Sequence, residues 1–140
     1  MSHSTTMEVN MKVSNETDLI ASLKAHFGED SVEIHTKPTT LNTYYDKPSD
    51  LKAHIIVRRK FLSKKIGHNV LSNDLGYTRQ DDGTYKMTVD DAGFSVKDRN
   101  KVAQDYTERV SVRKMKAQGF MTKKTMLPNG HVKLTCERYS

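Results

Sequence analysis

The stretch LGYTRQDDGTYKMTV, residues 75–89, decides the fold class, because it joins two runs of alternating apolar and polar residues through a tight turn. Asp81-Asp82-Gly83 interrupts the alternation, and glycine adopts the positive φ of such a turn without steric cost. Tyr85, Met87 and Val89 are spaced two apart and therefore share one face of a strand. The stretch predicts an antiparallel hairpin with one buried face.

Two segments on either side of this hairpin have the spacing of amphipathic helices. Ser95 can cap a helix that runs to about Gln118, and Gly119 is placed to end it. In the other segment Asn15 can offer a side-chain oxygen to the free amides of a helix that ends at Gly28. The apolar positions that carry the helical spacing are Leu19, Ile20, Leu23, Phe27, Val102, Ala103, Tyr106, Val110 and Ala117.

The rest of the chain has mainly the two-residue period of strands. Alternation predicts strands at 7–13 and 31–36, and the β-branched run Ile55-Ile56-Val57 predicts a strand at 53–61 that turns basic at Arg58. A terminal hairpin of 120–127 with 131–139 is expected around Asn129-Gly130. The segment 37–50 has few burial cues and two Lys-Pro pairs, which predicts a loop.

The predicted element order is β-α-β-β-(ββ)-α-β-β. It indicates an α+β fold, in which residues 1–140 form a single two-layer domain with both helices packed on one face of a mostly antiparallel sheet. The chain has 140 residues, of which 35% are hydrophobic, enough for one small core. It has neither an apolar run of roughly 18 residues nor a signal-peptide pattern. A cytoplasmic protein with no membrane contact is therefore expected.

These segments, in this order, resemble an uncharacterised family of small proteins from plastid genomes, where they are hypothetical chloroplast reading frames, and from cyanobacteria and some phages, catalogued as domain of unknown function twelve fifty-seven. The chain differs from the family in ending Arg138-Tyr139 rather than Arg-Trp, and in having Ala92-Gly93 where aromatic residues are usual. It resembles a divergent, phage-type member. The matching features are Met1-Ser2-His3, Asp18-Leu19, Phe27-Gly28, Ile55-Ile56-Val57, Gly76-Tyr77, Tyr85 with Asp90, Gln104-Asp105-Tyr106, Gln118-Gly119-Phe120, and the closing Gly130, Val132, Leu134, Arg138 and Tyr139.

The family has no established catalytic residues, and its members are often encoded near AAA-type ATPases. The resemblance therefore implies an accessory role beside such a protein machine, in the host cytoplasm if the chain is encoded by a phage.

Charge is distributed unevenly along the chain, whose formal net charge is +6. Residues 1–50 have 4 Lys against 8 acidic residues, whereas residues 51–140 have 19 basic against 9 acidic residues. Such asymmetry is typical of a face that binds a polyanion or an acidic protein, although a solvated surface has the same pattern. The candidate contact residues are Arg58, Arg59, Lys60, Lys64, Lys65, Lys114, Lys116, Lys123 and Lys124.

Sets of residues that carry catalysis or bind metal are incomplete. The six histidines lack paired metal-ligand spacing, the single Cys136 alternates with apolar residues as a buried side chain would, and the common phosphate-binding loops and the nucleophile elbow are missing. The one His-x-Ser/Thr motif, at His3, is half of what a two-histidine phosphoesterase needs. Asp90-Asp91 can hold Mg²⁺ only if both carboxylates face the same way, which neighbouring strand residues do not. We expect no catalytic residues, no metal and no cofactor.

The first hypothesis is therefore a non-catalytic accessory protein that binds a protein partner through 58–65 and the exposed face of 95–118. A nucleic-acid-binding module using the same basic residues is the alternative, although no Gly-x-x-Gly clamp or aromatic RNA-binding motif accompanies them. A small enzyme of unidentified class is the third hypothesis.

Overall fold

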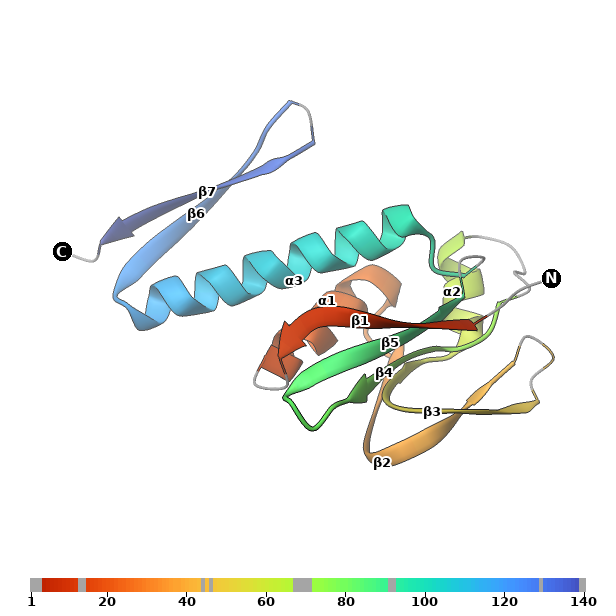
Figure 1. Cartoon of the computed structure of the whole chain (residues 1–140). Coiled ribbons are helices and arrows are strands. Elements are labelled where there is room, and N and C mark those ends of the chain that lie inside the picture. The colour runs from red at the N-terminus through yellow and green to blue at the C-terminus, as the bar shows by residue number, and fades with distance from the viewer. Residues whose placement is uncertain are drawn as a thin grey trace.

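A computed structural model describes residues 4–12, 15–43, 45, 47–66, 72–90, 93–128 and 130–138 (Figure 1). Within these ranges, residues 4–12, 66, 121–123, 132 and 136–138 are described by their backbone alone. The elements are β1 (Ser4–Lys12), α1 (Glu16–Phe27), β2 (Val32–Asn42), β3 (Pro48–Val57), α2 (Arg59–Ile66), β4 (Leu75–Arg79), β5 (Thr84–Asp90), α3 (Val96–Ala117), β6 (Phe120–Met126) and β7 (Val132–Arg138). The α+β fold class is confirmed.

Five strands form one antiparallel sheet in the order β1-β5-β4-β3-β2. The predicted hairpin supplies the adjacent strands β4 and β5, with Tyr77 opposite Met87, and Gly83 in its turn has the positive φ of 84°. The first strand of the chain joins the far side of β5, where Met7 lies opposite Met87. The predicted hairpin is therefore confirmed and lies near the middle of the sheet.

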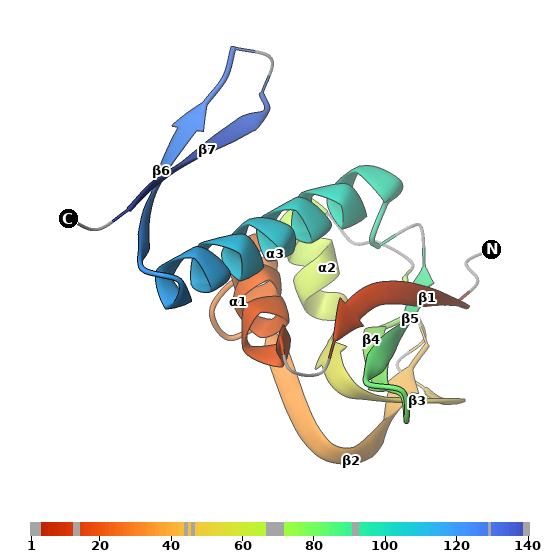
Figure 2. The ribbon, with the colours of Figure 1, turned by 60° about the vertical axis from the view of Figure 1, so that its left-hand side comes forward.

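The three described helices lie on one side of this sheet and bury one face of it (Figure 2). Tyr85, Met87 and Val89 all point into the core, as their spacing predicts. Each helix contributes apolar side chains to the same cluster. Its members are Leu19, Leu23, Phe27, Ile55, Val57, Leu62, Leu75, Tyr77, Tyr85, Met87, Val89, Phe94, Val102 and Tyr106.

A small second cluster covers the opposite face of the sheet where β2 and β3 bend over β4. It consists of Leu41, Ala53 and Ile56. These residues approach so closely that a Cβ at Gly76 would lie 2.6 Å from Ala53 Cβ, which explains a glycine in the centre of β4.

An irregularity in β3 at His54 changes which face of the sheet the neighbouring residues occupy. Ala53 belongs to the second cluster, whereas Ile55, two positions on, belongs to the main core. The backbone N–H of Arg79 donates to His54 Nδ1 over 3.0 Å, in place of a backbone carbonyl. Burial lowers the pKa of His54, and the nearby Arg79 adds to this effect, so a neutral ring whose unprotonated Nδ1 accepts this hydrogen bond is favoured.

The terminal hairpin β6–β7, hereafter the arm, forms a separate two-stranded sheet that projects beyond the core (Figure 1). It follows α3 directly, through Gly119 at a φ of 84°. The prediction that Ser95 caps α3 is confirmed, because its side chain accepts from the N–H of Asp98. The register of the arm places Lys124 opposite Leu134.

Two predictions about the region around Arg58 are wrong. The predicted strand 53–61 ends at Val57, and α2 begins at Arg59, so the chain has three described helices where two were expected. The reason is not local: the carboxylate of Asp74 accepts from the N–H of Arg59 over 2.7 Å and so caps the helix from 15 positions further along the chain.

The predicted loop at 37–50 is also mostly wrong, because β2 continues to Asn42 and β3 starts at Pro48. The pairing shifts register between Ile34 and Thr39, and this irregular segment accommodates Pro38, which has no N–H to pair. Asn15 precedes α1 as predicted, but its side chain makes no capping hydrogen bond. None of the described helices is both long and apolar enough to cross a membrane.

Candidate functional site

The basic residues predicted as contacts divide into two groups at different ends of α3. Arg59, Lys60, Lys64 and Lys65 all lie on α2, beside the amino-terminal half of α3 (Figure 2). The other group lies at the carboxyl end of α3 and on β6: Lys114, Lys116, Lys123 and Lys124. A helix rises 1.5 Å per residue, so the first turns of α3 and Lys116 are separated by roughly 20 Å or more along its axis. The structure therefore has two basic areas.

Arg58, the first of the predicted contact residues, is held by acceptors of the protein itself. Its guanidinium donates twice to Glu33, over 2.8 and 3.0 Å, and its Nη1 donates to Asp74 over 2.9 Å and to the carbonyl of Thr40 over 3.0 Å. This pairing with the guanidinium lowers the pKa of Glu33 and raises that of Arg58. The side chain of Arg58 is therefore a bridge within the fold.

Asp74 is the centre of this network and is 1% exposed. Besides Arg58 and the N–H of Arg59, its carboxylate accepts from the N–H of Asn42 over 2.7 Å. Its own N–H donates to the carbonyl of Asn42 over 3.0 Å. A buried carboxylate needs this many donors. One side chain thus joins the end of β2, the start of α2 and the segment before β4.

Lys60, Lys64 and Lys65 are exposed on α2. The ammonium group of Lys60 lies 5.1 Å from the ring centre of Phe61 on the same helix, an ordinary cation–π distance. At the first position of α2, by contrast, Arg59 Nε donates to the carbonyl of Ser72 over 3.1 Å. The three lysines are the part of the predicted cluster that faces solvent.

His26 on α1 lies beside the first turn of α3, close to the basic residues of α2. Its side chain is 9% exposed, its ring packs edge-on against Phe27, and its Nε2 lies 3.3 Å from Asp98 Oδ1. Burial lowers its pKa below 6.5; Lys65 and, more weakly, Lys101 lower it further, while Asp98 acts in the opposite sense. The positive charges of Lys65 on α2 and Lys101 on α3 therefore both act on one imidazole. Lys101 was not among the predicted contacts.

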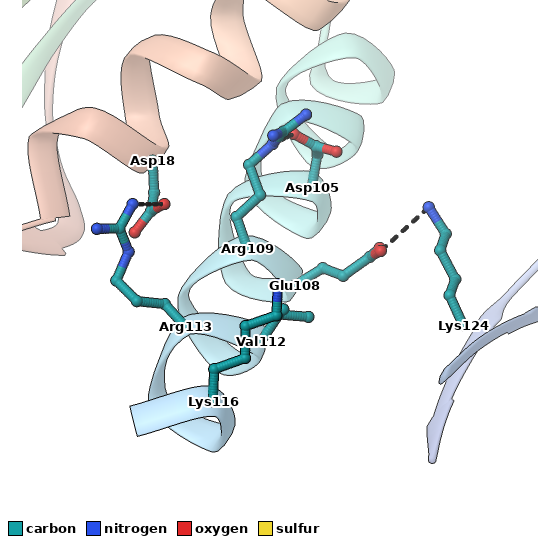
Figure 3. Close-up of a pocket in the computed structure, with 8 residues that line it drawn as sticks. All are labelled: Asp18, Asp105, Glu108, Arg109, Val112, Arg113, Lys116 and Lys124. Atoms are coloured by element: carbon teal, nitrogen blue, oxygen red, sulfur yellow. Dashed lines mark hydrogen bonds and ion pairs between the residues drawn. The ribbon is translucent and has the colours of Figure 1, made fainter. Parts of the chain in front are cut away.

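The second basic area borders a cleft of about 510 Å³ between the start of α1, the carboxyl half of α3 and β6 (Figure 3). Three ion pairs cross it or run along it: Arg113 with Asp18 at 2.8 Å, Arg109 with Asp105 at 2.7 Å, and Lys124 with Glu108 at 3.1 Å. Its described lining consists of Asp18, Asp105, Glu108, Arg109, Val112, Arg113, Lys116 and Lys124.

A shallower groove of about 360 Å³ runs between α3 and the arm. Small and apolar side chains line much of it, with Leu134 of β7 opposite the helix. The helical lining consists of Ala103, Gln104, Thr107, Glu108 and Ser111. Lys124 on β6 pairs with Glu108 beside this groove, so the arm is held to α3 in part by an ion pair.

The remaining chemical candidates from the sequence fall partly outside the described residues. Asp90 is buried and accepts from the N–H of Asn73 over 3.0 Å, while Asp91 and His3 lie outside the described residues and the side chain of Cys136 is not described. Across the described part of the chain, no three His, Cys, Asp or Glu side chains come together as metal ligands would. The two basic areas and the cleft are thus the candidate sites.

No protein-family model, curated protein or solved structure matches this chain. The family resemblance drawn from its motifs stays a prediction.

The network around Arg58 yields a stability prediction. Arg58→Met should lower the free energy of unfolding by about 2–4 kcal/mol, because it leaves the buried carboxylate of Asp74 without its charged partner. Urea unfolding followed by circular dichroism measures this. Arg109→Met is the matched control: the side chain of Arg109 is 41% exposed, and the loss should stay below about 1 kcal/mol. Equal losses in the two variants would contradict a structural role for Arg58.

The position of His26 yields a prediction on pH. Because its folded pKa lies below the unfolded value, its contribution to stability is complete above about pH 6.5 and is lost as pH falls through the folded pKa. Lys65→Gln should raise the pKa of His26, since it removes a nearby positive charge. An NMR titration of the imidazole protons measures the shift, with Lys37→Gln as the control. An unchanged pKa in the Lys65 variant would show that the two groups are not close.

Proposed function

We propose that this protein is a non-catalytic accessory protein that binds a protein partner through α3 and the arm. The observation that carries the proposal is the position of the arm, which projects from the core on the last residues of α3 (Figure 1). No side chain described in the arm belongs to either buried cluster. An isolated two-stranded hairpin gains little stability in water, so an arm of this kind is typical of a segment that packs on something else.

The surface of the arm supports the same interpretation. Met126 is 63% exposed, and Leu134 is half-buried at the groove beside α3. An extended segment or a helix of a partner can bury both side chains together with the small residues of α3 that line the groove. The nearby Lys114 and Lys116 favour a partner with an acidic surface. By the family resemblance, this partner is a protein machine such as an AAA-type ATPase in the cytoplasm.

Replacing apolar side chains of the arm tests this proposal. The double variant Met126→Glu and Leu134→Glu should lose the partner at least about tenfold, because it places carboxylates where apolar contact is needed. Quantitative mass spectrometry of complexes purified from the native cells measures the loss.

Ile34→Glu provides the matched control, because Ile34 is also a large exposed apolar residue, 53% exposed, but lies on β2 away from the arm. Proteins lost from the arm variant and kept by the Ile34 variant are the expected partners. A set of captured proteins that is the same for the wild type and both variants would overturn the role of the arm.

Nucleic-acid binding is the second candidate function, favoured by the three exposed lysines Lys60, Lys64 and Lys65 that share the short helix α2. These exposed lysines would then form a surface for phosphate groups. Phe61 is the one aromatic residue of α2, and the ring of His26 is largely buried, so contacts would be to the backbone rather than to stacked bases.

Changing the exposed lysines of α2 tests this second function. In the triple variant Lys60→Gln, Lys64→Gln and Lys65→Gln, affinity for a 20-nucleotide RNA or DNA should fall, and the slope of log K against log salt should become shallower by about 2. Fluorescence anisotropy at several salt concentrations measures both. The equally charged control variant is Lys37→Gln, Lys47→Gln and Lys52→Gln on β2, β3 and the turn between them. An equal loss of affinity in both triple variants would show that only net charge matters and would contradict a binding site on α2.

A further inference from the structure

Asp18 has an unusual environment at the inner end of the cleft described above. Its side chain is 7% exposed, and Oδ1 accepts from Arg113 Nη2 over 2.8 Å (Figure 3). The second oxygen, Oδ2, is buried and has no hydrogen-bond partner. A buried carboxylate oxygen without a donor is destabilising, and such atoms are rare in folded proteins. Oδ2 therefore marks a place where a hydrogen-bond donor is missing.

Positively charged side chains also line this cleft, and they favour a ligand that carries an anionic group. Lys116 lines the cleft, and its ammonium group forms no ion pair with the described residues. The guanidinium of Arg113 covers Asp18, yet its side chain is 59% exposed and free to turn toward solvent. A small ligand that fits both ends has hydroxyl donors at one end and an anion at the other.

The lining side chains also restrict the chemistry of the central part of such a ligand. Val112 is the one apolar residue among the described lining side chains, and none of them is aromatic. A planar base or ring therefore has nothing to stack on. A volume of about 510 Å³ is in the ordinary range for a small-molecule site. A compact, polar, phosphorylated molecule matches these limits.

We propose that this cleft binds a sugar phosphate. The phosphate is held by Lys116 and by Arg113, which turns away from Asp18, and the sugar hydroxyls donate to the Asp18 carboxylate in its place. Arg113 thus exchanges one anion for another, and the buried carboxylate gains the donors that it lacks. The chemistry has two sources, a free sugar phosphate or the ribose phosphate backbone of RNA. The groups that hold this ligand lie on α1 and α3 and not on α2, although Lys124 of the arm also lines the cleft.

Titrations of the full chain followed by amide NMR shifts in 105–116 test the proposal. The probes are ribose 5-phosphate, inorganic phosphate and unphosphorylated ribose, together with oligouridine RNA and oligothymidine DNA of equal length. A free sugar phosphate as the ligand predicts binding of ribose 5-phosphate about tenfold tighter than that of inorganic phosphate. The RNA backbone as the ligand predicts tighter binding of RNA than of DNA, with ribose 5-phosphate competing.

Two variants separate the parts of the site. Asp18→Asn should abolish the preference for ribose 5-phosphate over inorganic phosphate, and Lys116→Ala should weaken both about equally. Lys114→Ala is the matched control, because Lys114 is exposed on α3 and does not line the cleft. Since Asp18→Asn also alters a buried contact, Lys116→Ala keeps the test valid if that variant unfolds. The proposal is wrong if ribose 5-phosphate binds no tighter than phosphate while RNA binds no tighter than DNA.

Discussion

The carboxylate of Asp74 is the interaction on which the arrangement of this fold most depends. It accepts from Asn42, Arg58 and Arg59, and so fixes the end of β2, the guanidinium that reaches Glu33, and the first turn of α2. These segments are distant in sequence, and neither core cluster includes Asp74. The apolar core brings the helices onto the sheet, but this buried charge sets where β3 stops and α2 starts. A shift of one residue there would reorient the lysines of α2.

The local sequence patterns predicted most of the elements. Alternation and turn residues predicted both hairpins, and helical spacing predicted α1 and α3, because in each case the signal lies within the element itself. The local patterns did not predict α2, because half of residues 59–66 are basic and the helix is capped by a distant side chain. That side chain is Asp74, whose carboxylate accepts a hydrogen bond from the N–H of Arg59. The patterns failed at 37–42 because Pro38 argues against a strand, whereas the bulged pairing with β3 tolerates it.

The candidate sites were less accessible to sequence reasoning for a similar reason. A list of basic residues does not show which cations already have partners: Arg58 is bound within the fold, whereas Lys64 and Lys65 face solvent. The sequence also does not show that these basic residues form two groups, one near each end of α3. Asp18 and Arg113 are 95 positions apart, so nothing in the primary sequence indicates that they meet at one cleft.

The direction of the arm depends on a short joint. Gln118 and Gly119, the latter at a φ of 84°, are the two residues between α3 and β6, so their backbone torsions determine the angle at which the hairpin leaves the helix. Neither the sheet nor its buried face needs to change for that angle to change. A change in a few backbone torsions there would therefore swing the whole hairpin relative to α3, while the two-layer core stays the same.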